Sequence, residues 1–290
     1  NLVPVVADAW PGSFNAGPEQ IEAVLSEHTR AIVVAHIAGE PADMDPILEL
    51  ARSHNLPVVE DCAQAHGARY KGKLVGTLGD IAAVSTMSGK HHATGPQGGV
   101  VFTLDEELYW EAKRFADRGK PFNTDAGSNV RAGLNLNGNE LAAAIGRTQV
   151  GKLAGIIARR REVARRIYEG MAGLKAVSPG REIADSEATY WFLRFHVDAE
   201  KLTVDKAGFA QAMAAEGIPV MPSYRHIPSE ATWFRERKVF PGSDYPWGLP
   251  AYGGDRDAEF PCPNAVESTE SHFCLSIHEN LGERETEDVL

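Results

Sequence analysis

The sequence has few cysteines and no long apolar run, and both absences narrow its class. Only three of its 290 residues are cysteine (Cys62, Cys262 and Cys274), and no two of them form a CxxC pair. Neither a disulfide framework nor a structural zinc site fits so sparse a set, and we expect a protein of the reducing cytoplasm without a metal site. No stretch reaches the roughly 20 consecutive apolar residues of a membrane-spanning helix, so no membrane partner is expected.

Basic residues are also in deficit. Lys and Arg number 29 against 40 Asp and Glu, which gives a formal net charge of −11 at pH 7. Such a chain repels nucleic acid, and a nucleic-acid partner is not expected. An initiator methionine and a basic-plus-apolar leader are absent too, because the strand-like run 2–6 follows Asn1 at once. We therefore expect that a segment before Asn1 is missing.

The first 120 residues alternate short β-branched runs with amphipathic helical patterns. This alternation is typical of an α/β fold with a mostly parallel sheet sandwiched by helices. Nearly continuous apolar runs indicate strands that are buried on both faces. The runs that predict strands are 4–6, 31–35, 57–60, 81–85 and 99–103, and the patterns that predict helices are 18–27, 44–52 and one from 105 to 119.

The second half of the chain has a different pattern. Helical periodicity over 140–174 is followed by strand-like runs at 189–197 and 218–221 around a helical pattern at 205–216. We therefore expect a large α/β domain over residues 1–150 and, over 151–290, a linker helix with a smaller C-terminal α+β domain. The polar, glycine-bearing stretch 120–139 is too long for an ordinary connection and predicts a functional loop.

Two segments carry groups suited to chemistry. The run 57–60 is followed at once by Asp61 and, three residues later, by Gln64, and ligands of open α/β sheets bind at the carboxyl ends of strands. The run 81–85 is followed by a Ser- and Gly-rich loop that contains Lys90 and lacks the spacing of a Walker loop. On its own, Asp61 could be a helix N-cap and Lys90 a surface lysine.

Together, Asp61 and Lys90 suggest pyridoxal 5′-phosphate. A lysine amine forms a Schiff base with an aldehyde cofactor, and a carboxylate that faces a pyridine nitrogen keeps the ring protonated and electron-withdrawing. The hydroxyls of Ser85 and Ser88, with loop N–H groups, could hold the phosphate of that cofactor.

With these residues the sequence resembles the sugar aminotransferases of the DegT/DnrJ/StrS group, which are fold-type I pyridoxal phosphate enzymes. The resemblance extends over essentially the whole chain, and the intervals from Asp61 to Gln64, from Asp61 to Lys90 and from Ser85 to Lys90 all match the family. The segments that carry it are 4–8, 32–36, 39–45, 60–67, 76–80, 85–90, 133–135, 140–146 and 275–278.

The resemblance implies a role for each matching residue. Lys90 would bond the cofactor and move the proton of the reaction, and Asp61 would pair with the pyridine nitrogen. Gln64 would lie near the ring and its 3′-oxygen, and Ser85 would bind the phosphate. Asn135 would reach the phosphate of a neighbouring subunit, which implies a homodimer with shared active sites.

The chain departs from the family at several places. After the lysine it has Gly95-Pro96-Gln97-Gly98-Gly99, one residue longer than the usual run and without its glutamate. The arginine that the family has after Asn135 is absent, and so is the N-terminal part of the large domain, which puts substrate choice in doubt. His91, beside the lysine, is interpreted as a loop residue that touches solvent or substrate, and Tyr224 and His226 are further substrate-side candidates.

The sequence thus predicts an aminotransferase that moves an amino group from glutamate or glutamine to a nucleotide-linked keto sugar or to a keto cyclitol. Two alternatives stay open. One is a pyridoxal phosphate-dependent sugar dehydratase, a class in which histidine replaces the lysine. The other is a non-catalytic relative that binds the cofactor or a sugar for regulation.

Overall fold

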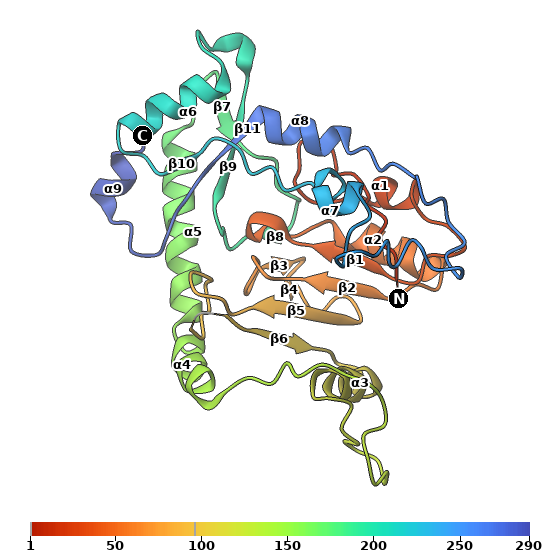
Figure 1. Cartoon of the computed structure of the whole chain (residues 1–290). Coiled ribbons are helices and arrows are strands. Elements are labelled where there is room, and N and C mark those ends of the chain that lie inside the picture. Colours follow the sequence, from red (N-terminus) through yellow and green to blue (C-terminus); the bar gives the residue numbers. More distant parts are fainter. Residues whose placement is uncertain (1, 96) are drawn as a thin grey trace.

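The computed structural model describes residues 2–95 and 97–290 and contains two four-stranded sheets (Figure 1). The first sheet has the order β1-β2-β5-β6, in which β1, β2 and β5 are parallel and β6 is an antiparallel edge strand. Its strands are β1 (Ile32–Ala35), β2 (Val58–Asp61), β5 (Ile81–Ser85) and β6 (Gly99–Phe102). The mostly parallel sheet and these four strands are therefore confirmed.

The run 4–6 is not a strand, so that prediction is wrong. Residues 2–8 are irregular. Pro4 has no N–H to donate to a ladder, which makes the run a poor strand despite its valines.

Helices cover one face of the first sheet. They are α1 (Pro18–Glu22) and α2 (Met44–Ser53), and Met44 and Ile47 of α2 join Ile32 and Val34 in one buried core. The opposite face is open, with Val33 68% exposed and Val101 58% exposed. The expectation that the strands are buried on both faces is thus wrong for the described residues. Because side chains alternate along a strand, Asp61 lies on the open face with Val33 and Val101.

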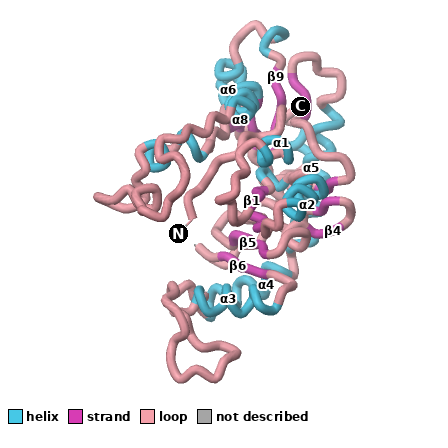
Figure 2. Tube along the Cα trace, turned by 90° about the vertical axis from the view of Figure 1, so that its right-hand side faces the viewer, coloured by secondary structure: helices cyan, strands magenta, loops and turns pink. Residues whose placement is uncertain are grey.

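A helix with an acidic cap follows the first sheet. It is α3 (Glu106–Ala116), and the carboxylate of Asp105 accepts a hydrogen bond from the Leu108 N–H, as a helix cap should. The loop after it leads to α4 (Glu140–Val150), which is capped by Asn139. Figure 2 shows α3 and its loop at the edge of the molecule. Few side chains of this region are buried.

The second sheet is antiparallel and has its own core. Its order is β10-β11-β9-β7, with β7 (Val177–Pro179), β9 (Leu193–Val197), β10 (Val220–Met221) and β11 (His272–Leu275). The strand predicted at 189–197 is therefore present as β9, but it begins four residues later than predicted. The long helix α5 (Leu153–Gly170) buries Val163 and Ile167 against this sheet. The division of the chain at residue 150 stays a prediction.

Shorter elements complete the fold. A small sheet joins β3 (Arg69–Tyr70) and β4 (Lys73–Leu74) to β8 (Ser186–Glu187), far along the chain. The remaining helices are α6 (Lys206–Ala215), α7 (Thr232–Arg235), α8 (Pro263–Ser271) and α9 (Glu283–Glu287). Nowhere in residues 2–95 and 97–290 is a helix both long enough and apolar enough to cross a bilayer.

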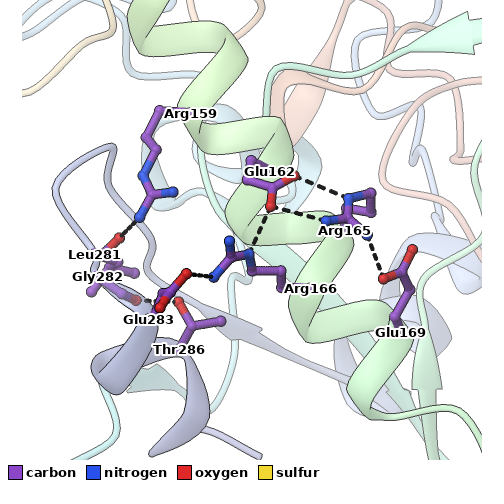
Figure 3. A network of polar contacts seen from close by, with 9 residues as sticks. All are labelled: Arg159, Glu162, Arg165, Arg166, Glu169, Leu281, Gly282, Glu283 and Thr286. Atoms are coloured by element: carbon purple, nitrogen blue, oxygen red, sulfur yellow. Dashed lines mark hydrogen bonds and ion pairs between the residues drawn. The ribbon is translucent and has the colours of Figure 1, made fainter.

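Ion pairs fasten the end of the chain to α5 (Figure 3). Glu162 accepts hydrogen bonds from Arg165 and Arg166, and Arg166 also pairs with Glu283 of α9. Arg159 donates to the carbonyl of Leu281. These arginines therefore have structural partners.

Candidate active site

The two predicted chemical groups lie at the same edge of the first sheet. β2 and β5 are parallel neighbours, with Asp61 opposite Ala83, so their carboxyl ends meet. Asp61 ends β2, and Lys90 follows β5 after a short loop. The charge of Asp61 acts to raise the pKa of the Lys90 amine.

A tight turn presents Lys90. The Lys90 N–H donates to the Met87 carbonyl at 3.1 Å, and Gly89 has a φ of 89°. A positive φ at the third residue of such a turn favours glycine, which explains the Gly before the lysine. The amine is half-buried, and this burial lowers its pKa despite the opposing charge of Asp61. A lowered pKa suits an amine that must lose its proton to react.

The amine of Lys90 rests on an indole ring. Nζ lies 4.3 Å from the centre of the Trp191 ring, within the range of a cation–π contact. The backbone of Trp191 is held in turn, because its main-chain N–H donates to the Ala38 carbonyl at 2.7 Å.

Asp61 is exposed at the strand end, and one of its oxygens is engaged. Oδ1 accepts a hydrogen bond from the Ala63 N–H at 2.9 Å. In the part of the chain that the structure describes, Oδ2 has no hydrogen-bond or ion-pair partner. The carboxylate is therefore oriented by its own turn and has an oxygen free for a ligand.

Gln64 is held from both sides. Its Oε1 accepts from the Ala38 N–H at 2.7 Å, and its Nε2 donates to the Tyr224 hydroxyl at 2.8 Å. The ring of Tyr224 lies 4.7 Å from that of His226, which is exposed. The structure thus brings the predicted cofactor residue Gln64 together with the predicted substrate residues Tyr224 and His226.

Ser85 and Ser88 flank the same loop. Ser85 ends β5 and its Oγ accepts from the Met87 N–H at 3.3 Å, while Ser88 is exposed in the turn. The Ser85 carbonyl accepts a hydrogen bond from Nε2 of His66 at 2.7 Å. Burial lowers the pKa of His66 to about 4, so its ring is neutral at pH 7. His66 therefore fixes the backbone of a predicted phosphate-binding residue.

His91 does not reach solvent, so that part of its interpretation is wrong. The side chain is buried, and its Nε2 donates to the Thr189 carbonyl at 2.9 Å. Its ring lies between those of His66 and Trp191, at 5.5 and 5.8 Å. Burial lowers its pKa to about 3. A substrate role for His91 stays a prediction.

Asn135 lies apart from this cluster. It is exposed on the loop after α3, its backbone forms a bridge with Asp117, and its side chain accepts from Asn137. In the described ranges no hydrogen bond joins it to Asp61 or Lys90. Its role across a subunit interface stays a prediction.

A buried acid beside Asp61 was not predicted as a site. His36, Glu60 and Cys62 place ligand atoms within 4.8 Å of one another, as a metal site would. However, the two oxygens of Glu60 already accept hydrogen bonds from the N–H groups of Gly76, Leu78 and Gly79 and from His36. Burial alone would raise the pKa of Glu60, but these hydrogen bonds outweigh it and the pKa is lowered. Glu60 therefore ties the 76–79 loop to the strand that carries Asp61.

Sequence reasoning also missed Trp191 and the positioning role of His66. His66 stands in the segment that was singled out, but nothing local shows that its ring turns back to Ser85. Trp191 is about 100 residues from Lys90 in the chain, so no spacing rule could join them.

The residues at this edge fit pyridoxal phosphate. In the described residues, neither Lys90 Nζ nor Asp61 Oδ2 has a hydrogen-bond or ion-pair partner, so an amine and a carboxylate are both available. Ser85, Ser88 and the N–H groups of the turn supply the kind of donors that hold a phosphate.

The fold and the site together define a fold-type I, pyridoxal phosphate-dependent aminotransferase architecture. The aminotransferase from Psychrobacter cryohalolentis has a similar crystal structure, with a TM-score of 0.83 and 31% identity over 99% of this chain and 73% of that one. The model of the DegT/DnrJ/EryC1/StrS aminotransferase family matches residues 1–290. The chain belongs to this family, which confirms the predicted family, fold class and cofactor class.

Curated relatives act on sugars and cyclitols, by their names. GDP-perosamine synthase of Escherichia coli O157:H7 is 36% identical over 190 residues, 66% of this chain and 51% of that protein. L-glutamine:2-deoxy-scyllo-inosose aminotransferase of Streptomyces fradiae is 34% identical over 241 residues, 79% of this chain and 56% of that protein. The chain thus spans about half the length of these two relatives.

Proposed function

We propose that this protein is a pyridoxal phosphate-dependent aminotransferase. It moves an amino group from glutamate or glutamine to a nucleotide-linked keto sugar or to a keto cyclitol. The observation that carries the proposal is the apposition of Asp61 and Lys90 at the shared edge of β2 and β5. The relatives named as a sugar-nucleotide synthase and as a cyclitol aminotransferase support the substrate class.

The chain's residues divide the work of this reaction. Pyridoxal phosphate supplies, when bound, an aldehyde that bonds amines and a ring that withdraws electrons. Lys90 holds the cofactor and moves a proton at its Nζ, which partial burial keeps ready to lose its charge. Asp61 holds the proton on the ring nitrogen, Ser85 and Ser88 bind the phosphate, and Gln64 orients the ring. Asn135 would serve the site of a second subunit.

A dehydratase is the second candidate. One relative, from Saccharopolyspora spinosa, is named dTDP-4-dehydro-2,6-dideoxy-D-glucose 3-dehydratase and is 32% identical over 235 residues, 73% of this chain and 49% of that protein. In that class a histidine replaces the lysine, whereas this chain keeps Lys90 and has His91 next to it. The presence of Lys90 disfavours this candidate, and His91 is buried with its Nε2 bonded to the Thr189 carbonyl.

Absorbance spectroscopy separates these candidates. The protein is loaded with pyridoxal phosphate, and L-glutamate or L-glutamine is added without a second substrate. A visible band that bleaches, with release of the corresponding keto acid, supports transamination. A band that no amino donor changes would contradict it and favour the dehydratase or a regulatory protein.

We further propose a homodimer, with the region around α3 and α4 as its interface. This region exposes large apolar side chains, among them Leu104 at 91% and Leu141 at 78%. Exposed apolar clusters of this kind mark interaction sites, and the expected role of Asn135 needs a second subunit. Leu141→Glu should shift the mass measured by light scattering from dimer to monomer, whereas Leu174→Glu, which is exposed elsewhere, should not.

A cytoplasmic location completes the proposal. The three cysteines are all free and buried, as expected in a reducing compartment. Cell fractionation with an antibody to this chain tests it, and recovery outside the cytoplasm would contradict it.

A further inference from the structure

The amine of Lys90 has an aromatic contact and, among the described residues, no polar partner. Its Nζ lies 4.3 Å from the Trp191 ring centre, and no carboxylate or hydrogen-bond acceptor in residues 2–95 and 97–290 engages it. Lys71 and Lys120 also lie over rings, but each pairs with a carboxylate as well, Asp45 and Asp117 respectively. Lys113 lies over rings without a carboxylate, but its Nζ donates to the Tyr109 hydroxyl. The contact with Trp191 is therefore the one that fixes the Lys90 amine.

The backbone segment of Trp191 is itself held in place. The main-chain N–H of Trp191 donates to the Ala38 carbonyl at 2.7 Å, and that of Thr189 donates to the Gly39 carbonyl at 3.0 Å. The Trp191 ring lies against that of His91, which is buried and bonded to the Thr189 carbonyl. The turn that carries Lys90 and the segment that carries Trp191 thus hold each other in place.

The same hydrogen bonds connect Trp191 to the predicted cofactor ring. Ala38 accepts from Trp191 through its carbonyl and donates through its N–H to Gln64. Ala38 has a φ of 62°, unusual for alanine, which allows its two groups to serve both neighbours. The backbone of Trp191 is therefore tied through Ala38 to Gln64, while its indole contacts Lys90.

We propose that Trp191 is a positioning residue that holds the amine of Lys90 at the site whenever that amine is not bonded to the cofactor; this rests on the proposed function of Lys90. A lysine that is bonded and freed in each turnover needs a resting contact that keeps it near the reacting atoms. A salt bridge would hold it firmly and keep it protonated. An aromatic face attracts the ammonium more weakly and accepts no proton, so the amine can leave the ring and bond the cofactor again.

The first test reads the contact directly by NMR. Lysines of the full chain, freed of cofactor, are reductively methylated with ¹³C-formaldehyde, and the Lys90 resonance is assigned by its loss in Lys90→Arg. Over an indole face this resonance should be shifted upfield of the exposed lysines. The shift should vanish in Trp191→Leu, become smaller in Trp191→Phe and persist in Trp233→Leu, which removes an exposed indole elsewhere.

The second test reads the consequence during turnover. With cofactor bound, Trp191→Leu should lower kcat by about tenfold with little change in KM for the amino donor, the size expected for one partly desolvated cation–π contact. Trp191→Phe should recover part of that loss. Borohydride should still fix the cofactor to Lys90 in both variants.

The outcomes are separable. A Lys90 resonance among those of the exposed lysines, or one equally shifted in Trp191→Leu, would overturn the inference. So would an unchanged kcat in Trp191→Leu. If borohydride instead fixes the cofactor to Lys90→Ala, the assignment of Lys90 as the cofactor lysine fails. The NMR test does not depend on that result, because it is done without cofactor.

Discussion

The side-chain amide of Gln64 donates a 2.8 Å hydrogen bond to the hydroxyl of Tyr224, 160 residues away. This contact links the turn after β2 to the loop after β10, so a residue predicted to face the cofactor is oriented by one predicted to face the substrate. The Tyr224 ring is itself packed against Phe192, with ring centres 4.7 Å apart. The predicted cofactor residue and the predicted substrate residue are therefore joined by one hydrogen bond.

Loss of that hydroxyl should weaken cofactor binding. In Tyr224→Phe, Nε2 of Gln64 loses its acceptor, which costs about 1 kcal/mol and should raise the Kd for pyridoxal phosphate by about fivefold. Equilibrium dialysis measures this. Tyr252→Phe, an equally mild change at a loop tyrosine bonded to Asp255, should bind normally. In a Gln64→Leu background, Tyr224→Phe should add almost nothing, and full additivity would contradict the coupling.

Removal of either central group should affect different steps. Lys90→Ala should abolish borohydride-stable attachment of the cofactor, because no other amine replaces it. Asp61→Asn should keep attachment but lower kcat by at least about a hundredfold, since a neutral amide does not hold a proton on the ring nitrogen. Mass spectrometry and a coupled keto-acid assay give the two readouts.

A matched change supplies the control for this pair. Asp45→Asn removes an exposed carboxylate whose partner is Lys71, and its kcat should equal that of the unaltered protein. Cofactor fixed by borohydride on Lys90→Ala would show that the lysine is assigned wrongly.

The ion pair between Glu40 and Arg194 should be important for stability. Arg194 is fully buried in β9, and its Nε lies 3.0 Å from Oε1 of Glu40, after β1. Arg194→Met leaves a buried carboxylate alone and should lower the free energy of unfolding by about 3–5 kcal/mol. Urea denaturation measures it.

Replacement of both partners tests the cause. Glu40→Met combined with Arg194→Met removes both charges and should recover most of the loss. If the double variant is as unstable as the sum of the single ones, packing rather than charge explains the effect.

Acid should destabilise the fold through buried histidines. Burial lowers the pKa of His66 to about 4 and that of His91 to about 3, from an ordinary value of about 6.5. Between these values the unfolded chain binds protons that the folded chain does not, so stability falls as the pH falls from about 6.5 to about 4. Each of these histidines should lower the free energy of unfolding by about 2 kcal/mol at pH 5.

Urea denaturation at several pH values tests this effect. His91→Gln should flatten the dependence of unfolding free energy on pH, whereas His28→Asn, whose ring is exposed, should not. An unchanged slope in His91→Gln would show that folding does not lower the pKa of His91.

Much of the first sheet and of the site was predictable because local rules govern it. The helices that Asp105 and Asp205 cap lie where helical patterns were predicted, and β5 ends at the expected residue. Asp61, Gln64 and Lys90 lie at strand ends because apolar strands stop where polar residues begin. The failures have physical causes as well. Pro4 disfavours the strand that the valines of run 4–6 suggested. The sequence of β1 could not show that Val33 is exposed to solvent.

The sequence by itself determined which chemical groups stand at the carboxyl ends of β2 and β5, since spacing and periodicity act over a few residues. Only the tertiary structure decided what meets them: that Trp191 lies on Lys90, that His91 turns inward to Thr189, and that Tyr224 reaches Gln64. These contacts join residues about 100 to 160 positions apart. Their formation depends on how the two sheets pack, which no local pattern encodes.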